Sequence, residues 1–222
     1  MNLQLSRYLS TICILLLLTG CKGEAIFNRK VDLSDSYTLN FDGTTSYGTL
    51  DSPWVPTGAN WEIQLELVWD SSVGANSYPI ATNSSTSSIY IDSGGLPLLK
   101  YEGSYITSNV SRLVDGEFAT VKFSVSATEV KCYFNNTLES TVATANTLSV
   151  PWTVVGAHAT YISKFKGQIR KISLNDLDDT SNSRVLDFVF KTEDLSTLTV
   201  EGIRDSLDVD FILPAGDRFI EI

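Results

Sequence analysis

The stretch Phe118–Thr141, FATVKFSVSATEVKCYFNNTLEST, decides the fold class of this 222-residue chain. Apolar residues occupy alternate positions in Ala119–Val125 and again in Val130–Phe134, a period of two that is typical of strands with one buried face. The pair Asn135-Asn136 tolerates positive φ angles, so we expect a tight type I′ turn there. The stretch therefore predicts a three-stranded antiparallel meander whose apolar side packs on a second sheet.

Strand patterns continue on both sides of this meander. The strictest alternation is in Trp61–Trp69, which places Trp61, Ile63, Leu65, Leu67 and Trp69 on one side. Shorter candidate strands lie at 37–41, 47–50, 79–82, 88–91, 98–101, 105–107, 184–191, 198–203, 209–213 and 219–222. We therefore predict an all-β protein, a two-sheet antiparallel jelly-roll sandwich over residues 37–222, with the acidic strands of 175–222 packed on it.

Three fragments occur in the order seen in one known family. They are YTLNFDGTTSYGTL at 37–50, the hairpin that begins with Gly116-Glu117-Phe118, and FKGQI at 165–169, which follows Val155-Gly156-Ala157 and precedes Ile172-Ser173-Leu174. Together they resemble concanavalin A-like or laminin-G-like jelly-roll domains, although Ala119-Thr120 replaces the paired histidines of that family and Asn136 replaces its glycine. The resemblance implies carbohydrate or protein adhesion.

The net charge of −10 is unevenly distributed. After Ile172 the chain has twelve acidic residues against four basic ones. This segment is interpreted as a solvated face. No basic stripe is present that could neutralise phosphates, so nucleic acid is not an expected partner.

The N-terminal residues indicate a cellular location. Arg7 precedes an apolar run that is too short to span a bilayer, which is typical of a signal-peptide core. The following Leu18-Thr19-Gly20-Cys21 resembles the lipobox of bacterial lipoproteins, which implies cleavage before Cys21 and acylation of that cysteine. We expect a signal peptide at 1–20, a tether at 21–36, and a lipid anchor in the outer membrane because Lys22 is not the aspartate of an inner-membrane retention signal. The alternative is an ordinary secretory signal with a chance cysteine.

Few side chains are candidates for catalysis or metal binding. Cys132 lies on the apolar side of a strand and is expected to be a buried hydrophobe, and His158, the single histidine, is expected in a solvated turn. The acidic group Asp176, Asp178 and Asp179 lacks the glycine and glutamate of an EF-hand. Jelly-roll glucanases often hold calcium through an aspartate of the closing strand, and Arg170 occupies the corresponding position here. We therefore expect no metal and no cofactor.

One acidic motif suggests hydrolysis. Glu62-Ile63-Gln64-Leu65-Glu66 resembles the E-x-D-x-E strand of lichenase-type β-glucanases, whose two outer glutamates act as nucleophile and acid/base. Gln64 replaces the central aspartate, so we interpret the motif as a solvated polar stripe opposite a buried one.

Aromatic residues in or beside loops are candidate sugar platforms, because sugar rings stack their C–H faces on flat aromatic surfaces. The candidates are Trp54, Tyr78, Tyr90, Tyr101, Tyr105 and Trp152, of which Trp54, Tyr90, Tyr101 and Tyr105 are predicted to bind ligand. Trp54 is predicted to be exposed because its flanking prolines favour an extended, unpaired segment. The alternative is that most of these rings fill gaps at the sandwich edges.

The sequence thus predicts a surface-anchored, lectin-like lipoprotein without catalytic activity, which binds a glycan or another cell-surface macromolecule. A jelly-roll glycoside hydrolase using Glu62 and Glu66 is one alternative. A structural or phage-encoded envelope protein is another.

Overall fold

The computed structural model describes residues 36–84, 86–101, 104–107, 111–143, 150–160, 163–191, 209–212 and 219–221. Apart from strands, these residues form two single-turn 3₁₀ helices, η1 (Ser71–Val73) and η2 (Thr180–Asn182). Within these ranges, none of the helices has the length and hydrophobicity needed to cross a membrane.

The strands form two antiparallel sheets. Sheet A contains, in spatial order, β10 (Thr137–Ala143), β9 (Glu129–Phe134), β8 (Phe118–Val125), β3 (Trp61–Trp69), β12 (Lys166–Asp176), β1 (Ser36–Asp42) and β14 (Val189–Lys191), with β13 (Arg184–Asp187) beside β12 and β16 (Phe219–Glu221) beside β1. Sheet B contains β15 (Val209–Ile212), β2 (Tyr47–Trp54), β11 (Trp152–Val155), β4 (Ser77–Thr82), β5 (Ser88–Ile91), β6 (Pro97–Tyr101) and β7 (Ser104–Thr107). Ser36, which the sequence assigned to the tether, already belongs to β1.

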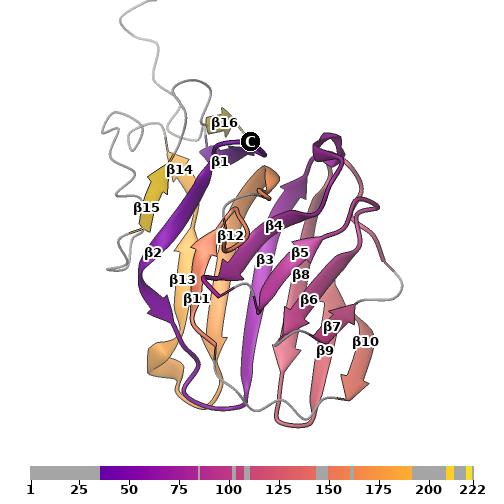
Figure 1. The fold of residues 1–222 in the computed structure, drawn as a ribbon, viewed down its shortest axis with the longest axis vertical. Coiled ribbons are helices and arrows are strands. Elements are labelled where there is room, and N and C mark those ends of the chain that lie inside the picture. The colour runs from indigo at the N-terminus through magenta and orange to yellow at the C-terminus, as the bar shows by residue number, and fades with distance from the viewer. Residues whose placement is uncertain are drawn as a thin grey trace, which may run out of the picture. The chain divides into compact units, whose positions relative to one another are not determined.

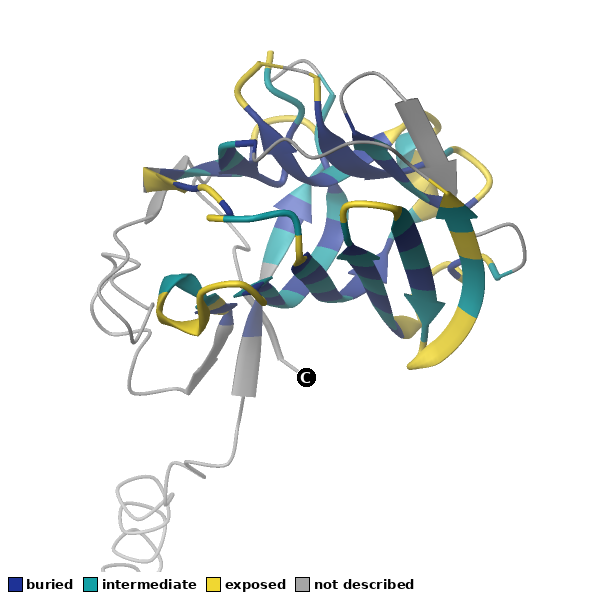
Figure 2. Ribbon diagram, turned by 90° about the horizontal axis from the view of Figure 1, so that it is seen from below, coloured by how far each residue is buried: buried dark blue, intermediate teal, exposed yellow. Residues whose placement is uncertain are grey.

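The two sheets are stacked as layers. In Figure 1 the strands β4, β5 and β6 lie in front of β3 and β8. Figure 2 shows buried and partly exposed residues alternating along the strands. The predicted two-sheet antiparallel jelly roll is confirmed.

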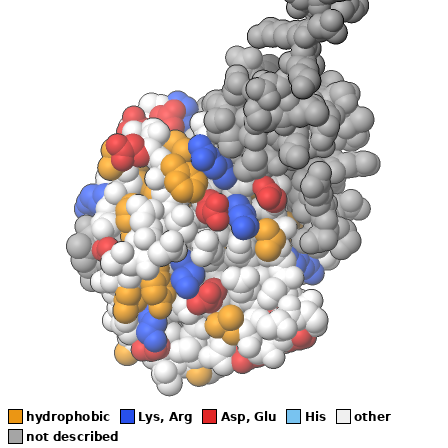
Figure 3. Space-filling model, turned by 180° about the vertical axis from the view of Figure 1, so that it is seen from behind, with side chains coloured by type: hydrophobic (Ala, Val, Ile, Leu, Met, Phe, Trp, Pro, Cys, Tyr) orange, Lys and Arg blue, Asp and Glu red, His pale blue; other side chains and the backbone are white. Residues whose placement is uncertain are grey.

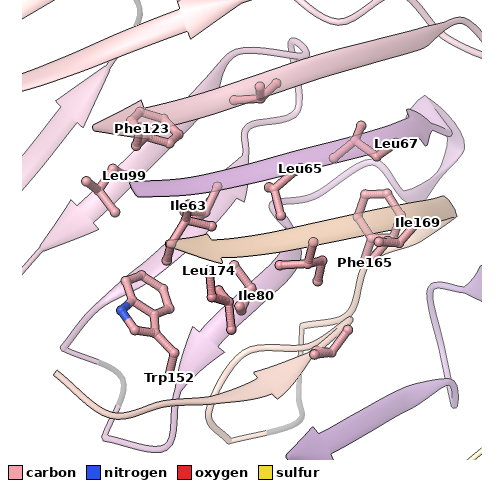
Figure 4. Close-up of a cluster of buried hydrophobic side chains, with 14 of the residues drawn as sticks. Ile63, Leu65, Leu67, Ile80, Leu99, Phe123, Trp152, Phe165, Ile169 and Leu174 are labelled. Carbon is pink, nitrogen blue, oxygen red and sulfur yellow. The ribbon is translucent and has the colours of Figure 1, made fainter. Parts of the chain in front are cut away.

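The core lies between the layers, and β3 runs through its centre. The five alternate residues predicted to face inward in β3 are all buried. Figure 4 shows Ile63, Leu65 and Leu67 beside side chains of β8, β12 and sheet B, among them Phe123 and Trp152. Full burial of a large apolar side chain contributes roughly 1.5–3 kcal/mol, so this row accounts for much of the stability of the sandwich.

The meander β8–β9–β10 forms as predicted. Asn135 and Asn136 connect β9 to β10 with φ angles of 46° and 65°, the left-handed values that a type I′ turn requires. Cys132 is fully buried on the inner side of β9, which confirms its interpretation as a core residue.

The C-terminal strands belong to the same two sheets. β13 pairs with β12, β14 and β16 pair with β1, and β15 pairs with β2. The candidate strand 184–191 is interrupted at Phe188, whose side chain is buried in the core. The candidate strand 198–203, the signal peptide, Cys21 and the tether up to residue 35 lie outside the described residues.

Candidate functional site

Two of the rings predicted to bind ligand are core residues. Trp54 and Tyr101 are buried and pack on Trp61 of β3, with ring centroids 6.2 and 5.7 Å from its indole. Trp152 packs on the same indole at 5.9 Å. The prediction that Trp54 is exposed is therefore wrong, and neither Trp54 nor Tyr101 offers a free face for a sugar.

The burial of Trp54 has a specific cause. β2 does not end at Leu50 but continues through Pro53 to Trp54, which pairs with Trp152 after an irregularity in the register. β15 pairs with β2 only up to Leu50, so Pro53 follows where that edge of β2 has no partner strand among the described residues, and its missing N–H costs no ladder bond there. The indole Nε1 of Trp54 also donates a 2.8 Å hydrogen bond to the carbonyl of Asn182.

The remaining predicted residues lie elsewhere. Tyr90 of β5 is 8% exposed, and its register partner Leu98 is half-buried. Tyr105 lies in β7 opposite Lys100, but its side chain is outside the described residues, as is Cys21. Their roles stay predictions.

Tyr78, Tyr90 and His158 form a group of stacked rings, which we call the aromatic cluster. The rings of Tyr78 and Tyr90 are stacked, with centroids 5.3 Å apart and an interplanar angle of 27°. His158 approaches Tyr78 edge-on at 4.8 Å and 67°. Tyr78 and His158 are partly exposed, whereas Tyr90 is buried. The cluster belongs to the outer side of sheet B, because the neighbouring β5 residues Ile89 and Ile91 point into the core.

The backbone of β4 turns Tyr78 outward. The pairing of β4 with β5 shifts register between Ser77 and Ile80, so two residues, Tyr78 and Pro79, lie between two inward-facing positions. Such a bulge re-aims side chains that a regular pleat would send inward. Simple alternation could not predict the direction of this tyrosine.

A short hairpin brings His158 to Tyr78. Gly156 has a φ of 76°, and a Cβ at this position would lie 2.3 Å from the ring of Phe41, so only glycine fits. The amide of Gly156 donates to the carbonyl of Pro79, and the amide of His158 donates to the carbonyl of Ser163 at 2.7 Å. The hairpin is therefore fixed to β4 beside Tyr78.

The surroundings of His158 favour a neutral imidazole. Burial lowers the pKa of His158 below its usual value, and the positive charge of Lys100 lowers it further. Its Nδ1 lies 3.2 Å from the hydroxyl of Thr160. A neutral imidazole can both donate and accept a hydrogen bond. The sequence prediction of a fully solvated histidine is thus only half right, because the ring is partly buried against Tyr78.

A small apolar group lies below the surface beside His158. Ala81, Val154 and Ala157 are fully buried on the outer side of sheet B, and Tyr47 packs against them. Lys164 lies over the Tyr47 ring at 5.6 Å. The groups that a sugar could meet here are the partly exposed Tyr78 and His158, whose rings suit its C–H faces and whose phenol and imidazole suit its hydroxyls.

The outer side of sheet A has a different chemistry, and we call it the ion-paired face. Glu62 lies 3.3 Å from Lys122 of β8, and Glu66 lies 4.0 Å from Lys171 of β12. Figure 3, which views the molecule from behind, shows acidic and basic side chains next to each other among apolar patches. Because β8 and β12 flank β3 on opposite sides, the two carboxylates turn away from each other.

Two other carboxylates are held by hydrogen bonds within the protein. Asp176 is buried and accepts hydrogen bonds from Thr57, Asn182 and the amides of Asp178 and Asp179. Burial alone would raise the pKa of Asp176, but these donors outweigh it and hold the pKa well below its usual value. Asp42 is held in the same way by donors from residues 44–46. Among the side chains that the structure describes, no group of three His, Cys, Asp or Glu could hold a metal ion.

Comparison with known proteins identifies the fold. No protein-family model and no curated protein matches the chain. Solved structures do: a heptameric SAP-like pentraxin from Limulus polyphemus is 14% identical over 72% of this chain and 96% of its own, with a TM-score of 0.49. Domains LG4-5 of the mouse laminin α1 chain are 18% identical over 71% of this chain, with a TM-score of 0.46. A carbohydrate-binding candidate from Bacteroides ovatus is 12% identical over 65% of this chain, with a TM-score of 0.50.

The fold is a two-sheet antiparallel jelly roll. The chain spans only 46% of the laminin and Bacteroides structures that it matches. At these identities the likeness concerns the fold, and the site must be argued from the residues of this chain.

Proposed function

We propose that this protein is a lectin-like glycan-binding protein without catalytic activity, and that the aromatic cluster is its binding site. The observation that carries the proposal is the partly exposed ring of Tyr78, which stacks on Tyr90 and meets His158 edge-on at the outer side of sheet B. A ring already fixed by such contacts loses little conformational freedom when a sugar binds to it. Carbohydrate binding is also what the name of the matched Bacteroides structure suggests for that protein.

The proposal of a binding protein over a hydrolase rests on the arrangement of the glutamates. A retaining glycosidase needs two carboxyl groups about 5 Å apart that flank one bond. Glu62 and Glu66 are directed to lysines on opposite neighbours of β3, and each is paired there.

The binding test compares variants of the full chain in detergent on a glycan array, followed by calorimetric titration of the best ligand. Tyr78→Ala should lower affinity about tenfold, which corresponds to a stacking contribution of about 1.4 kcal/mol. Tyr78→Phe keeps the ring and should retain most of the affinity. Tyr133→Ala is the matched control, because Tyr133 is a half-buried tyrosine of the ion-paired face that contacts Lys122.

Other outcomes would contradict the proposal. Equal loss in Tyr78→Ala and Tyr133→Ala, or a lowered melting temperature in Tyr78→Ala alone, would show that the ring only supports the fold. Polysaccharide turnover that disappears in Glu62→Gln or Glu66→Gln would identify the hydrolase instead. An absence of both binding and turnover would favour the structural envelope protein.

We further propose that the protein is anchored in the outer membrane through lipidated Cys21, and that residues 1–20 are removed. The proposal rests on the apolar run after Arg7 and on the match of Leu18–Cys21 to the lipobox. Metabolic labelling with palmitate in a bacterial host should mark the protein and should fail in Cys21→Ala. Labelling that survives this substitution would remove the anchor from the proposal.

A further inference from the structure

Arg170 differs from the lysines of sheet A whose side chains the structure describes. Each of these lysines is paired with an acid: Lys122 with Glu62, Lys131 with Glu129, Lys166 with Asp70 and Lys171 with Glu66. The described part of the chain provides no carboxylate and no hydrogen-bond acceptor for Arg170, and its Nε is buried without a partner. A guanidinium has five N–H donors in a rigid plane, and within the described residues no protein group accepts a hydrogen bond from those of Arg170.

The position of Arg170 in the strand is also unusual. Ile169 pairs with Leu67 and Lys171 pairs with Glu66, so Arg170 is an extra residue in β12 that has no counterpart in β3. The extra residue is a β-bulge, and it places Arg170 and Lys171 outside the core between the buried Ile169 and Ile172. Bulges commonly re-aim a side chain for a purpose other than packing.

Arg170 is held against an exposed aromatic ring. Its guanidinium carbon lies 4.7 Å from the ring centroid of Phe118, which is itself 46% exposed. Stacking on the ring fixes the plane of the guanidinium and leaves its edge for hydrogen bonds. Since Nε is the one nitrogen of Arg170 that is both buried and without a partner, the terminal nitrogens are open to solvent.

Two carboxylates lie near Arg170 in the register, and neither forms an ion pair with it. Glu66 of β3 and Asp187 of β13 both lie opposite Lys171, and Glu66 is directed to that lysine. Val68 lies between Phe118 and Gln168 in the register and is almost completely buried. The Oε1 of Gln168 is a second buried polar atom without a partner, two residues from Arg170 on the same strand. Unpaired buried polar atoms in a native protein often mark a functional site.

We propose that Arg170 and Phe118 form a binding subsite for a sugar that carries a carboxylate, that is, a uronic acid unit of an acidic glycan. The fork of the guanidinium pairs with both oxygens of a carboxylate. The exposed ring of Phe118 offers an apolar surface for the C–H face of the same sugar. The subsite lies on sheet A and is independent of the aromatic cluster on sheet B, so either proposal can fail without the other.

The net charge of the whole chain bears on how an acidic sugar would bind to Arg170. The protein carries a net charge of −10, so an acidic polymer is repelled in general and needs a local cation without a partner. Binding at one arginine should weaken as salt is added, because part of the attraction is electrostatic.

The test uses the full chain in detergent with Tyr78→Ala introduced throughout, so that the aromatic cluster does not contribute. Oligomers of galacturonic acid and their methyl-esterified forms are titrated by calorimetry. The free acid should bind at least tenfold more tightly than the ester. Arg170→Met should abolish this difference, Arg170→Lys should restore part of it, and Phe118→Ala should weaken both ligands. Lys122→Met is the matched control, because it removes a paired cation from the same face.

Three outcomes would overturn the subsite. The first is equal affinity for the acid and the ester in the unsubstituted Arg170 background, and the second is an acid preference that survives Arg170→Met. The third is equally tight binding of poly-glutamate, which would assign the arginine to an acidic protein partner instead of a glycan. The melting temperature of each variant is measured, so that affinities are compared only between variants that are folded.

Discussion

The two outer faces of the sandwich are built from the same kind of pleated strand but present different side chains. On sheet A the two glutamates of β3 pair with lysines of β8 and β12, so these charges satisfy one another. On sheet B a bulge and a hairpin collect rings at the surface instead. The difference teaches that exposure alone does not mark a site. A binding site is better indicated by a side chain that is exposed, is fixed in place by its neighbours and still has a ring face or a hydrogen-bonding group available for a ligand.

The largest expected effect is on stability, and it concerns the contact between the two sheets. Asp176 ends β12 of sheet A and binds Thr57, which follows β2 of sheet B. Asp176→Ala removes the charged acceptor of five partly buried hydrogen bonds and should lower the free energy of unfolding by about 3 kcal/mol, measured by urea titration. Asp178→Ala removes an exposed carboxylate two residues away and should cost much less.

The same carboxylate predicts a pH dependence. Because the pKa of Asp176 is lowered in the folded protein, its stabilising contribution is fully present above the ordinary aspartate pKa of about 3.9 and is lost as pH falls below it. The stability difference between wild type and Asp176→Ala should be constant from pH 7 to pH 5 and shrink below about pH 4. A difference that grows in acid would contradict the assigned role.

A smaller effect is expected on the ion-paired face itself. Lys122 pairs with Glu62 at 3.3 Å and lies 4.3 Å from the ring centroid of Tyr133. Partly exposed ion pairs contribute little, so Lys122→Met should lower the free energy of unfolding by about 0.5 kcal/mol and leave glycan binding unchanged. A loss of binding in Lys122→Met would contradict the assignment of that glycan to the aromatic cluster on sheet B.

The smallest expected effect is a shift in the pKa of His158 in the aromatic cluster, which can be measured without a change in the stability of the protein. His158 is the single histidine, so its ring signals can be followed by NMR without assignment of others. Its titration midpoint should lie below 6.5, because burial and Lys100 lower its pKa. Tyr78→Ala exposes the imidazole and should shift the midpoint back toward 6.5, whereas Lys122→Met should not move it. A midpoint above 6.5 would show that the imidazole is not shielded as described.

Much of the fold could be predicted because it follows from the alternation of apolar and polar residues along the strands. The inward row of β3 and the turn at Asn135-Asn136 needed only the period of two and the tolerance of asparagine for positive φ. Each is a local property of the chain. The sequence also favoured a solvated polar stripe over catalytic glutamates, but it did not predict that Glu62 and Glu66 pair with lysines.

The site was less predictable because bulges and long-range pairing decide it. Trp54 was expected at the surface from its prolines, but β11 extends the pairing of β2 and carries the ring into the core. Tyr78 and His158 are 80 residues apart, and their contact depends on a register shift in β4 and on the left-handed Gly156. The glycine in Val155-Gly156-Ala157 was a usable signal for the turn but not for its partner.

The bulge in β12 adds one residue, Arg170, that the inward-facing row of this strand does not use. Without Arg170 the strand would pass from Ile169 through Lys171 to Ile172 in unbroken in-out order, and the inner layer would keep every side chain it has now. The inward alternation of β12 therefore does not need Arg170, whose backbone instead accepts a 2.8 Å hydrogen bond from the amide of Phe188 and whose side chain is left for the outer face.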